Sequence, residues 1–249
     1  MSSLSALPMN LFFIRIRKLL HAFSSSSGMR ALKHGVAASI EHSSALGDVQ
    51  YKTIVDIGAN VGQFALFARE RYPKAAIFSF EPLEDCWTTF SSIFGSDQQV
   101  QLFRCAIGPT DAKAAINVTK ENDSSSLLAP AATQVEVFGT EVSAKKTVEL
   151  RRLPSVLSGE QIATPALLKI DVQGFELDVL RGSEELLERF DTIYVEASYV
   201  ELYQGQALAG DVIEYLRTRR FELRGVFNQH LDGSRGPLQA DFLFKQVRS

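Results

Sequence analysis

The sequence has few of the residues that build disulfide or metal sites. Its 249 residues include two cysteines, Cys86 and Cys105, and four histidines. The cysteines show no paired spacing, which favours buried thiols, a reducing compartment and hence a cytoplasmic protein. The histidines are scattered, and no two of them have the H-x-x-x-H spacing of a helical metal site. We therefore expect no dedicated metal site.

An excess of positive charge is also missing. The formal net charge is −3, whereas nucleic-acid-binding proteins normally carry a basic patch or have a high isoelectric point. We therefore expect no nucleic-acid partner. With 45% hydrophobic and 22% charged residues, the composition is that of a globular protein large enough for one α/β domain.

Acidic residues are absent from the first 40 positions. Residues 11–23 predict a basic amphipathic helix, because their apolar side chains are spaced for one face. This stretch is too short to span a bilayer and lacks the unbroken apolar core of a secretory signal. Three interpretations stay open: a helix packed on the domain or on a partner subunit, a peripheral membrane contact, and a removed targeting segment. We divide the chain into a helical leader, residues 1–50, and a globular domain, residues 51–249.

Strand and helix patterns alternate along the domain, which predicts a doubly wound parallel sheet. Strands are expected at residues 53–57, 76–80, 100–107, 167–171, 192–196, 221–227 and 240–244, and helices at 29–42, 63–71, 84–94, 175–187 and 211–219. Two further strands, 114–118 and 147–151, flank a polar excursion rich in serine and threonine. We interpret residues 112–152 as a substrate-side flap, with a disordered surface loop as the alternative.

Residues 53–64 predict a nucleotide-sized binding site. A β-branched strand ends in a turn where Gly58 and Gly62 permit close backbone approach to a ligand. The G-x-x-x-G spacing differs from the G-x-G-x-x-G of dinucleotide-binding folds. Asp56, in front of the turn, suits a cationic or polyhydroxylated ligand. Glu81 follows the next strand, 25 residues after Asp56, where a carboxylate can accept both hydroxyls of a ribose.

Carboxylates at the ends of adjacent strands resemble the pattern of S-adenosylmethionine (SAM) methyltransferases. Further along, the segment LKIDVQGFEL at residues 168–177 resembles the K-I-D-V-E-G-F-E-L signature of the FkbM family of methyltransferases. Other matches fall in the family's order: Phe80-Glu81-Pro82, Ser124-Ser125-Ser126-Leu127, Ile193-Tyr194-Val195-Glu196 and Asp241-Phe242-Leu243-Phe244. Together they cover residues 50–246. One departure is Gln173, where the family usually has glutamate.

The resemblance implies a Rossmann-like sheet of seven strands, the last one antiparallel, and S-adenosyl-L-methionine as cofactor. Asp56 is expected near the methionine part of SAM and Glu81 on the ribose. The backbone of residues 58–60 is expected to offer polar groups to the methionine part. The expected cofactor-binding set is Asp56, Gly58, Ala59, Asn60, Gly62, Phe64, Glu81, Pro82, Ala106 and Asp171.

Acids at strand ends are also the candidates for chemistry, because ligands of open α/β sheets lie outside the carboxyl ends of the strands. Such an acid taken alone is often a helix cap or an arginine partner, but four of them converge on one edge here. Asp171 is our candidate for the general base or for orienting the acceptor hydroxyl. Glu196 is the second candidate, for holding substrate hydroxyls. Lys169 shares the face of Asp171, and we favour its pairing with an acid over a catalytic role.

The sequence thus predicts a SAM-dependent methyltransferase acting on a hydroxyl of a sugar, glycan or secondary metabolite. One alternative is a SAM-binding protein without turnover, suggested by Gln173. Another is an NAD(P)-dependent oxidoreductase, which the missing third glycine and the lack of a Tyr-x-x-x-Lys pair disfavour. The sequence leaves open which acceptor and atom are methylated, and the oligomeric state.

Overall fold

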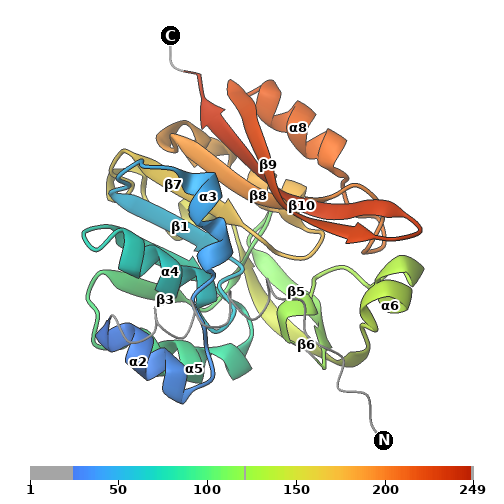
Figure 1. Cartoon of the computed structure of the whole chain (residues 1–249), viewed down its shortest axis with the longest axis horizontal. Coiled ribbons are helices and arrows are strands. Elements are labelled where there is room, and N and C mark those ends of the chain that lie inside the picture. Colours follow the sequence, from blue (N-terminus) through green and yellow to red (C-terminus); the bar gives the residue numbers. More distant parts are fainter. Residues whose placement is uncertain (1–24, 121, 248–249) are drawn as a thin grey trace, which may run out of the picture.

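A seven-stranded sheet forms the centre of the computed structural model, which describes residues 25–120 and 122–247 (Figure 1). Its strand order is β3-β2-β1-β7-β8-β10-β9. Five neighbouring strands run parallel: β3 (Val100–Phe103), β2 (Ala76–Phe80), β1 (Thr53–Ile57), β7 (Ala166–Ile170) and β8 (Thr192–Ser198). The last strand, β10 (Gly236–Gln246), is antiparallel to both β8 and β9 (Phe221–Asp232). The expected sheet with an antiparallel last strand is confirmed.

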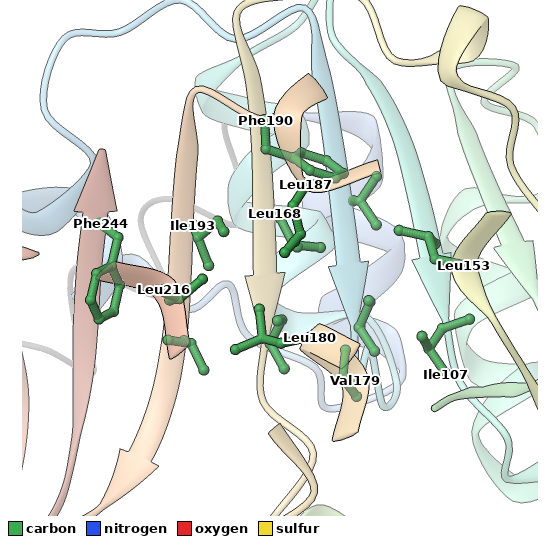
Figure 2. Close-up of a cluster of buried hydrophobic side chains, with 14 of the residues drawn as sticks. Ile107, Leu153, Leu168, Val179, Leu180, Leu187, Phe190, Ile193, Leu216 and Phe244 are labelled. Carbon is green, nitrogen blue, oxygen red and sulfur yellow. The ribbon is translucent and has the colours of Figure 1, made fainter. Parts of the chain in front are cut away.

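Helices cover both faces of this sheet, as a doubly wound fold requires. One face packs against α2 (Ser26–Lys33), α3 (Ser43–Leu46), α4 (Gln63–Arg71) and α5 (Glu84–Phe94). The other packs against α7 (Glu176–Gly182), η5 (Glu184–Arg189) and α8 (Ala209–Arg217). Figure 2 shows this second core, where Leu168 and Ile193 of the sheet lie beneath Leu180 of α7 and Leu216 of α8. Each such buried side chain contributes about 1.5–3 kcal/mol, so the two cores fix the sheet rigidly.

A second, smaller sheet lies beside the first and is formed by the predicted flap. Its strand order is β4 (Ala106–Ile107), β6 (Val142–Arg151), β5 (Ala112–Thr119), with β5 and β6 antiparallel. The connection between them carries η2 (Asn122–Ser124) and α6 (Ala132–Phe138), next to the β9–β10 hairpin in Figure 1. The predicted pair of strands is therefore present, and α6 gives the excursion a helix that the sequence reading had missed.

Several predicted boundaries are wrong. The strand expected at residues 100–107 is split, because β4 leaves the central sheet to pair with β6. The helix expected at 29–42 ends at Lys33, before Gly35 at φ +70°, and the chain resumes as η1 (Ile40–His42). The helix expected at 175–187 breaks at Ser183, whose hydroxyl donates to the Val179 carbonyl at 2.8 Å. Short 3-10 segments also occur at η3 (Leu153–Ser155) and η4 (Gly159–Gln161).

The leader helix predicted at residues 11–23 lies outside the described residues. Among the described helices, none has the length and apolar character needed to cross a bilayer.

Candidate active site

A cavity of about 550 Å³ opens at the carboxyl ends of β1, β2 and β7. Its walls come from segments far apart in the chain: residues 34–42 before β1, the β1–α4 turn, residues 80–83 after β2, residues 105–107, residues 123–127 of the flap connection, and residues 169–175 after β7. This is the edge at which an open α/β sheet binds its ligand. The cavity is therefore the candidate active site.

The β1–α4 turn is shaped by Gly58. This residue has φ +83°, and a Cβ there would lie 1.8 Å from the carbonyl oxygen of Asp171, so only glycine fits. The Gly58 and Ala59 N–H groups donate to the Phe80 carbonyl at 3.1 and 3.0 Å, and the Asn60 N–H donates to Glu81 Oε2 at 2.9 Å. These three N–H groups are thus engaged within the protein. All three residues line the cavity, and the prediction that their backbone offers polar groups to the methionine part of SAM stays a prediction.

Glu81 is 6% exposed and lies in the cavity wall. Its Oε1 accepts the Leu83 N–H at 2.8 Å, and its Oε2 accepts the Asn60 N–H. Burial raises the pKa of this carboxyl to about 7, although the two backbone donors and Lys169 act in the opposite direction. Each oxygen retains a further acceptor position, so a fixed carboxylate faces the cavity with room for two hydroxyl donors.

Lys169 is a buried cation shared by two acids. Its Nζ lies 3.2 Å from Asp56 Oδ1, 3.7 Å from Asp171 Oδ2 and 3.2 Å from the Gly58 carbonyl oxygen to which it donates. Burial alone would lower the pKa of Lys169, but the Asp56 and Asp171 carboxylates raise it above its ordinary value. Lys169 is therefore an ammonium ion and not a base, as the pairing interpretation expects. Burial raises the pKa of Asp56 in spite of this ion pair.

Asp171 lies in the cavity wall with 38% of its side chain exposed. Its N–H donates to the Ile57 carbonyl at 3.1 Å, which joins the end of β7 to the end of β1. Its Oδ1 accepts from Gln173 Nε2 at 3.0 Å. The amide contacts one oxygen of this carboxyl group and the lysine lies near the other, but the partly exposed side chain also lines the cavity, where it can accept a proton from a bound hydroxyl.

Glu196 does not line the cavity. Its Oε2 accepts from Gln173 Nε2 at 3.0 Å, and its Oε1 accepts from Gln239 Nε2 at 2.9 Å. Burial, followed by the nearby Asp171 and Asp241 carboxylates, raises its pKa well above the ordinary value. Gln173 therefore lies between Glu196 and Asp171, and contact of Glu196 with substrate hydroxyls stays a prediction.

The structure brings most of the predicted residues to the cavity. Those in its wall are Gly58, Ala59, Asn60, Phe64, Glu81, Pro82, Ala106, Lys169 and Asp171. Asp56 and Gly62 are not among the residues of its wall: Asp56 is fully buried beside Lys169, and a Cβ on Gly62 would face Phe94 Cε2 at 2.7 Å. Their contact with the cofactor stays a prediction. In the part of the chain that the structure describes, no three His, Cys, Asp or Glu side chains are grouped to hold a metal ion.

Sequence reasoning missed a polar cluster that includes His42 in the cavity wall. His42 Nδ1 lies 3.0 Å from the Tyr194 hydroxyl, which donates to Asp241 Oδ2 at 2.7 Å. Asn228 Nδ2 also donates to that oxygen at 2.7 Å. Burial opposes it, but His42, Asn228 and Tyr194 together lower the pKa of Asp241. The match at Asp241-Phe242-Leu243-Phe244 could have indicated this aspartate, whereas His42 had no signal beyond being one of four histidines.

Comparisons with known proteins identify a methyltransferase family. A family model described as "Methyltransferase FkbM domain" matches residues 56–223. The 2-O-methyltransferase NoeI of Sinorhizobium fredii is 31% identical over 187 residues, covering 72% of this chain and 76% of that protein. Methyltransferase 1 of Beauveria bassiana is 31% identical over 158 residues, covering 57% of this chain and 63% of that protein.

Among solved structures, the chain resembles the 1,6-didemethyltoxoflavin-N1-methyltransferase of Burkholderia thailandensis with a TM-score of 0.44 and 12% identity, covering 100% of this chain and 94% of that one. The family match spans most of the chain and includes both carboxylates of the cavity wall, Glu81 and Asp171. The chain belongs to the FkbM family of methyltransferases.

Proposed function

We propose that this chain is a SAM-dependent O-methyltransferase whose acceptor is a hydroxyl of a sugar, glycan or secondary metabolite. The observation that carries the proposal is the convergence of Glu81 and Asp171 on one cavity at the carboxyl edge of the sheet. NoeI, which shares 31% identity, is named a 2-O-methyltransferase, and this supports oxygen as the methylated atom.

The residues of the cavity fit SAM. Glu81 offers two acceptor positions for the ribose hydroxyls, as described above. Ala106 and Pro82 give apolar walls for an adenine. Phe64 also lines the cavity, and Lys169 Nζ lies 5.4 Å from the centroid of the Phe64 ring. When bound, SAM supplies a methyl group on a positively charged sulfur, which is already a strong electrophile. An anionic wall suits such a cation, and Asp171 provides that charge.

Asp171 is the residue that we propose meets the acceptor. Its carboxylate can orient the acceptor hydroxyl and take its proton as the oxygen attacks the methyl group. Lys169 supports this role by holding a positive charge 3.7 Å from Asp171 Oδ2, which helps to fix the position of the carboxyl group. Because the methyl donor is reactive, positioning of the hydroxyl can supply much of the rate. We keep Glu196 as a supporting residue, since it contacts Gln173 and not the cavity.

The alternatives receive less support. Membership of a methyltransferase family disfavours an oxidoreductase. A binding protein without turnover was suggested by Gln173, yet this amide is hydrogen-bonded to Asp171 and leaves that carboxylate in the cavity wall.

Both cysteines are buried and free, which supports a cytoplasmic location. Contact of the leader with a membrane surface or a partner stays a proposal.

The test is a product mass measurement. The protein is incubated with SAM and a panel of sugars, glycans and hydroxylated metabolites, and a gain of one methylene in one acceptor is expected. Methylation at nitrogen or carbon, assigned by fragmentation of the product, would reject the oxygen acceptor. Failure of SAM to bind in calorimetry would reject the cofactor.

A further inference from the structure

The side chain of Gln173 lies between two carboxylates, those of Asp171 and Glu196, and is hydrogen-bonded to both. Its Nε2 lies 3.0 Å from Asp171 Oδ1 and 3.0 Å from Glu196 Oε2, and its Oε1 accepts from the Tyr203 hydroxyl at 3.0 Å. Only the amide nitrogen can donate, so these partners fix which way the amide faces. Both N–H bonds of the side chain are used, one on each acid.

The backbone of Gln173 is held as firmly as its side chain. It has φ +57°, a left-handed conformation that side chains other than glycine rarely adopt. The Ser126 hydroxyl donates to its carbonyl at 2.6 Å. The Glu176 carboxylate accepts the Gly174 N–H at 2.9 Å and the Val172 N–H at 3.3 Å, which fixes the same turn from its other side. Such over-determined strained residues cluster at functional sites.

The same contacts join the flap to the site. The Tyr203 hydroxyl that contacts Gln173 Oε1 also lies 3.0 Å from the Ser124 carbonyl. Gln134 Nε2 of α6 donates to the same Tyr203 hydroxyl at 3.2 Å. Ser126 pairs with Asn117 of β5 through two backbone hydrogen bonds of 2.8 and 3.1 Å. These hydrogen bonds connect Gln173 directly to the flap connection.

Gln173 differs in charge from the glutamate that the family usually has at this position. Its amide donates to both Asp171 and Glu196 without adding a third negative charge beside them. A glutamate at this position would instead share protons with its two neighbours. In this chain the two acids are therefore joined by hydrogen bonds from one neutral side chain.

We propose that Gln173 is a positioning residue for methyl transfer: it fixes the Asp171 carboxylate toward the acceptor hydroxyl and links it to the Ser124–Ser126 segment that closes the cavity. This inference rests on the proposed role of Asp171 as the base.

Two substitutions at one position test it. Gln173→Met keeps the length and removes both donors, and Gln173→Glu keeps the shape and adds a charge. Gln98→Glu is the matched control. Gln98 is exposed and lies before the amino end of β3, whereas the cavity lies at the carboxyl ends of the strands. Wild-type turnover is established first by product mass, and kcat, KM and SAM affinity are then measured against pH.

We expect Gln173→Met to lower kcat about 10- to 100-fold, part of the roughly 10²–10⁴ that a general base contributes, with SAM affinity changed by less than about threefold. In Gln173→Glu the acidic limb of the kcat profile should move to higher pH, because the added acid raises the pKa of its neighbours. Gln98→Glu should match wild type. Wild-type kcat and pH profile in both Gln173 variants would overturn the inference while leaving the proposed function intact.

A second readout serves if the wild type shows no turnover, a result that would count against the proposed function alone. The carboxyl added in Gln173→Glu has a folded-state pKa raised above its unfolded value. Its stabilising effect is present at low pH and is lost as pH rises. The variant should therefore unfold at progressively lower urea concentration than wild type between about pH 5 and about pH 8. A constant difference across that range would show that residue 173 does not contact the two acids and would reject the inference.

Discussion

Glu81 and Asp171 are both acids at strand ends, but their surroundings suit them to different tasks. Glu81 is almost wholly buried, and two backbone N–H groups fix both of its oxygens. Asp171 is more than a third exposed and lies beside a lysine. The fixed oxygens of Glu81 suit it to accept hydrogen bonds from a pair of donors at constant positions. The partly exposed Asp171 is better suited to contact an acceptor substrate.

The role of Glu81 can be tested by Glu81→Ala. Loss of one hydrogen bond to a charged acceptor costs about 1.5–3 kcal/mol, so losing the ribose contacts should lower SAM affinity by at least roughly one to two orders of magnitude. In wild type, affinity should also rise as pH increases through the folded pKa of about 7, because the ionised carboxyl is the better acceptor. Calorimetry at several pH values measures both effects. Unchanged affinity in a folded Glu81→Ala protein would remove the ribose assignment.

The role of Asp171 can be tested by Asp171→Asn, which keeps the size and removes charge and basicity. Methyl transfer should fall about 10²–10⁴-fold if Asp171 is the base, whereas SAM affinity should change little. Glu196→Gln is the matched comparison and should be milder, because Glu196 lies outside the cavity wall. Single-turnover kinetics separates chemistry from binding. Near-full turnover in Asp171→Asn would mean that orientation alone drives the reaction or that another base acts.

At the scale of elements, the site depends on turns that lock into one another. In the turn after β1, Gly58 packs so closely against the Asp171 carbonyl that follows β7 that there is no space for a Cβ. The Gly58 and Ala59 N–H groups of the same turn donate to the Phe80 carbonyl at the end of β2. The row of buried polar groups continues across the sheet, since Asp56 pairs in register with Lys169, and Lys169 with Tyr194. Asp241 on β10 then links this row to His42 in the segment before β1.

Gly58→Ala tests this interlocking of turns. The added methyl would overlap the Asp171 carbonyl, and φ +83° is unfavourable for alanine by about 1–2 kcal/mol before any clash. We expect at least about 2 kcal/mol of destabilisation and loss of turnover. Gly210→Ala is the control, because this position in α8 has no neighbour within 4 Å of the added methyl and a helix tolerates alanine well. Urea unfolding of both variants would decide, and equal stability would contradict the contact.

Much of this fold can be predicted from local sequence patterns. The strands at 53–57 and 76–80 and the helices at 63–71 and 84–94 have the predicted bounds, because burial, glycine turns and helical spacing are written within each segment. The division of residues 100–107 was not predictable, because β4 leaves the sheet to pair with Leu150 and Arg151, over 40 positions away. The contacts of Gln173 with Tyr203 and Ser126 likewise join residues 30 and 47 positions apart, and no local pattern encodes them.

At the scale of the whole molecule, two segments that are distant from one another in the chain cover the sheet edge and complete the wall of the cavity. Residues 34–42 cover the side of α4, and the flap connection supplies residues 123–127. The Ser39 N–H donates to the Gln63 carbonyl at 3.2 Å, which fastens the first of these segments to the start of α4. The two segments come from outside the strand-helix alternation, so they are where an acceptor would be recognised.

The boundary of the leader gives the last prediction. The predicted division at residue 50 would remove His42 and the rest of the 34–42 wall, whereas α2 already packs into the domain: Ala31 is buried, and Arg30 Nε donates to the Ile93 carbonyl at 2.7 Å. Deletion of residues 1–24 keeps α2 and the 34–42 wall, so we expect SAM affinity and thermal stability to be unchanged. Deletion of residues 1–33 should lower the melting temperature by several degrees, because it removes α2 and exposes the surface of α5 against which this helix packs. Calorimetry and thermal unfolding of the two truncations measure this difference. Equal stability of both would place the start of the folded domain after α2, and a loss of SAM binding on deletion of residues 1–24 alone would give the leader a part in the site itself.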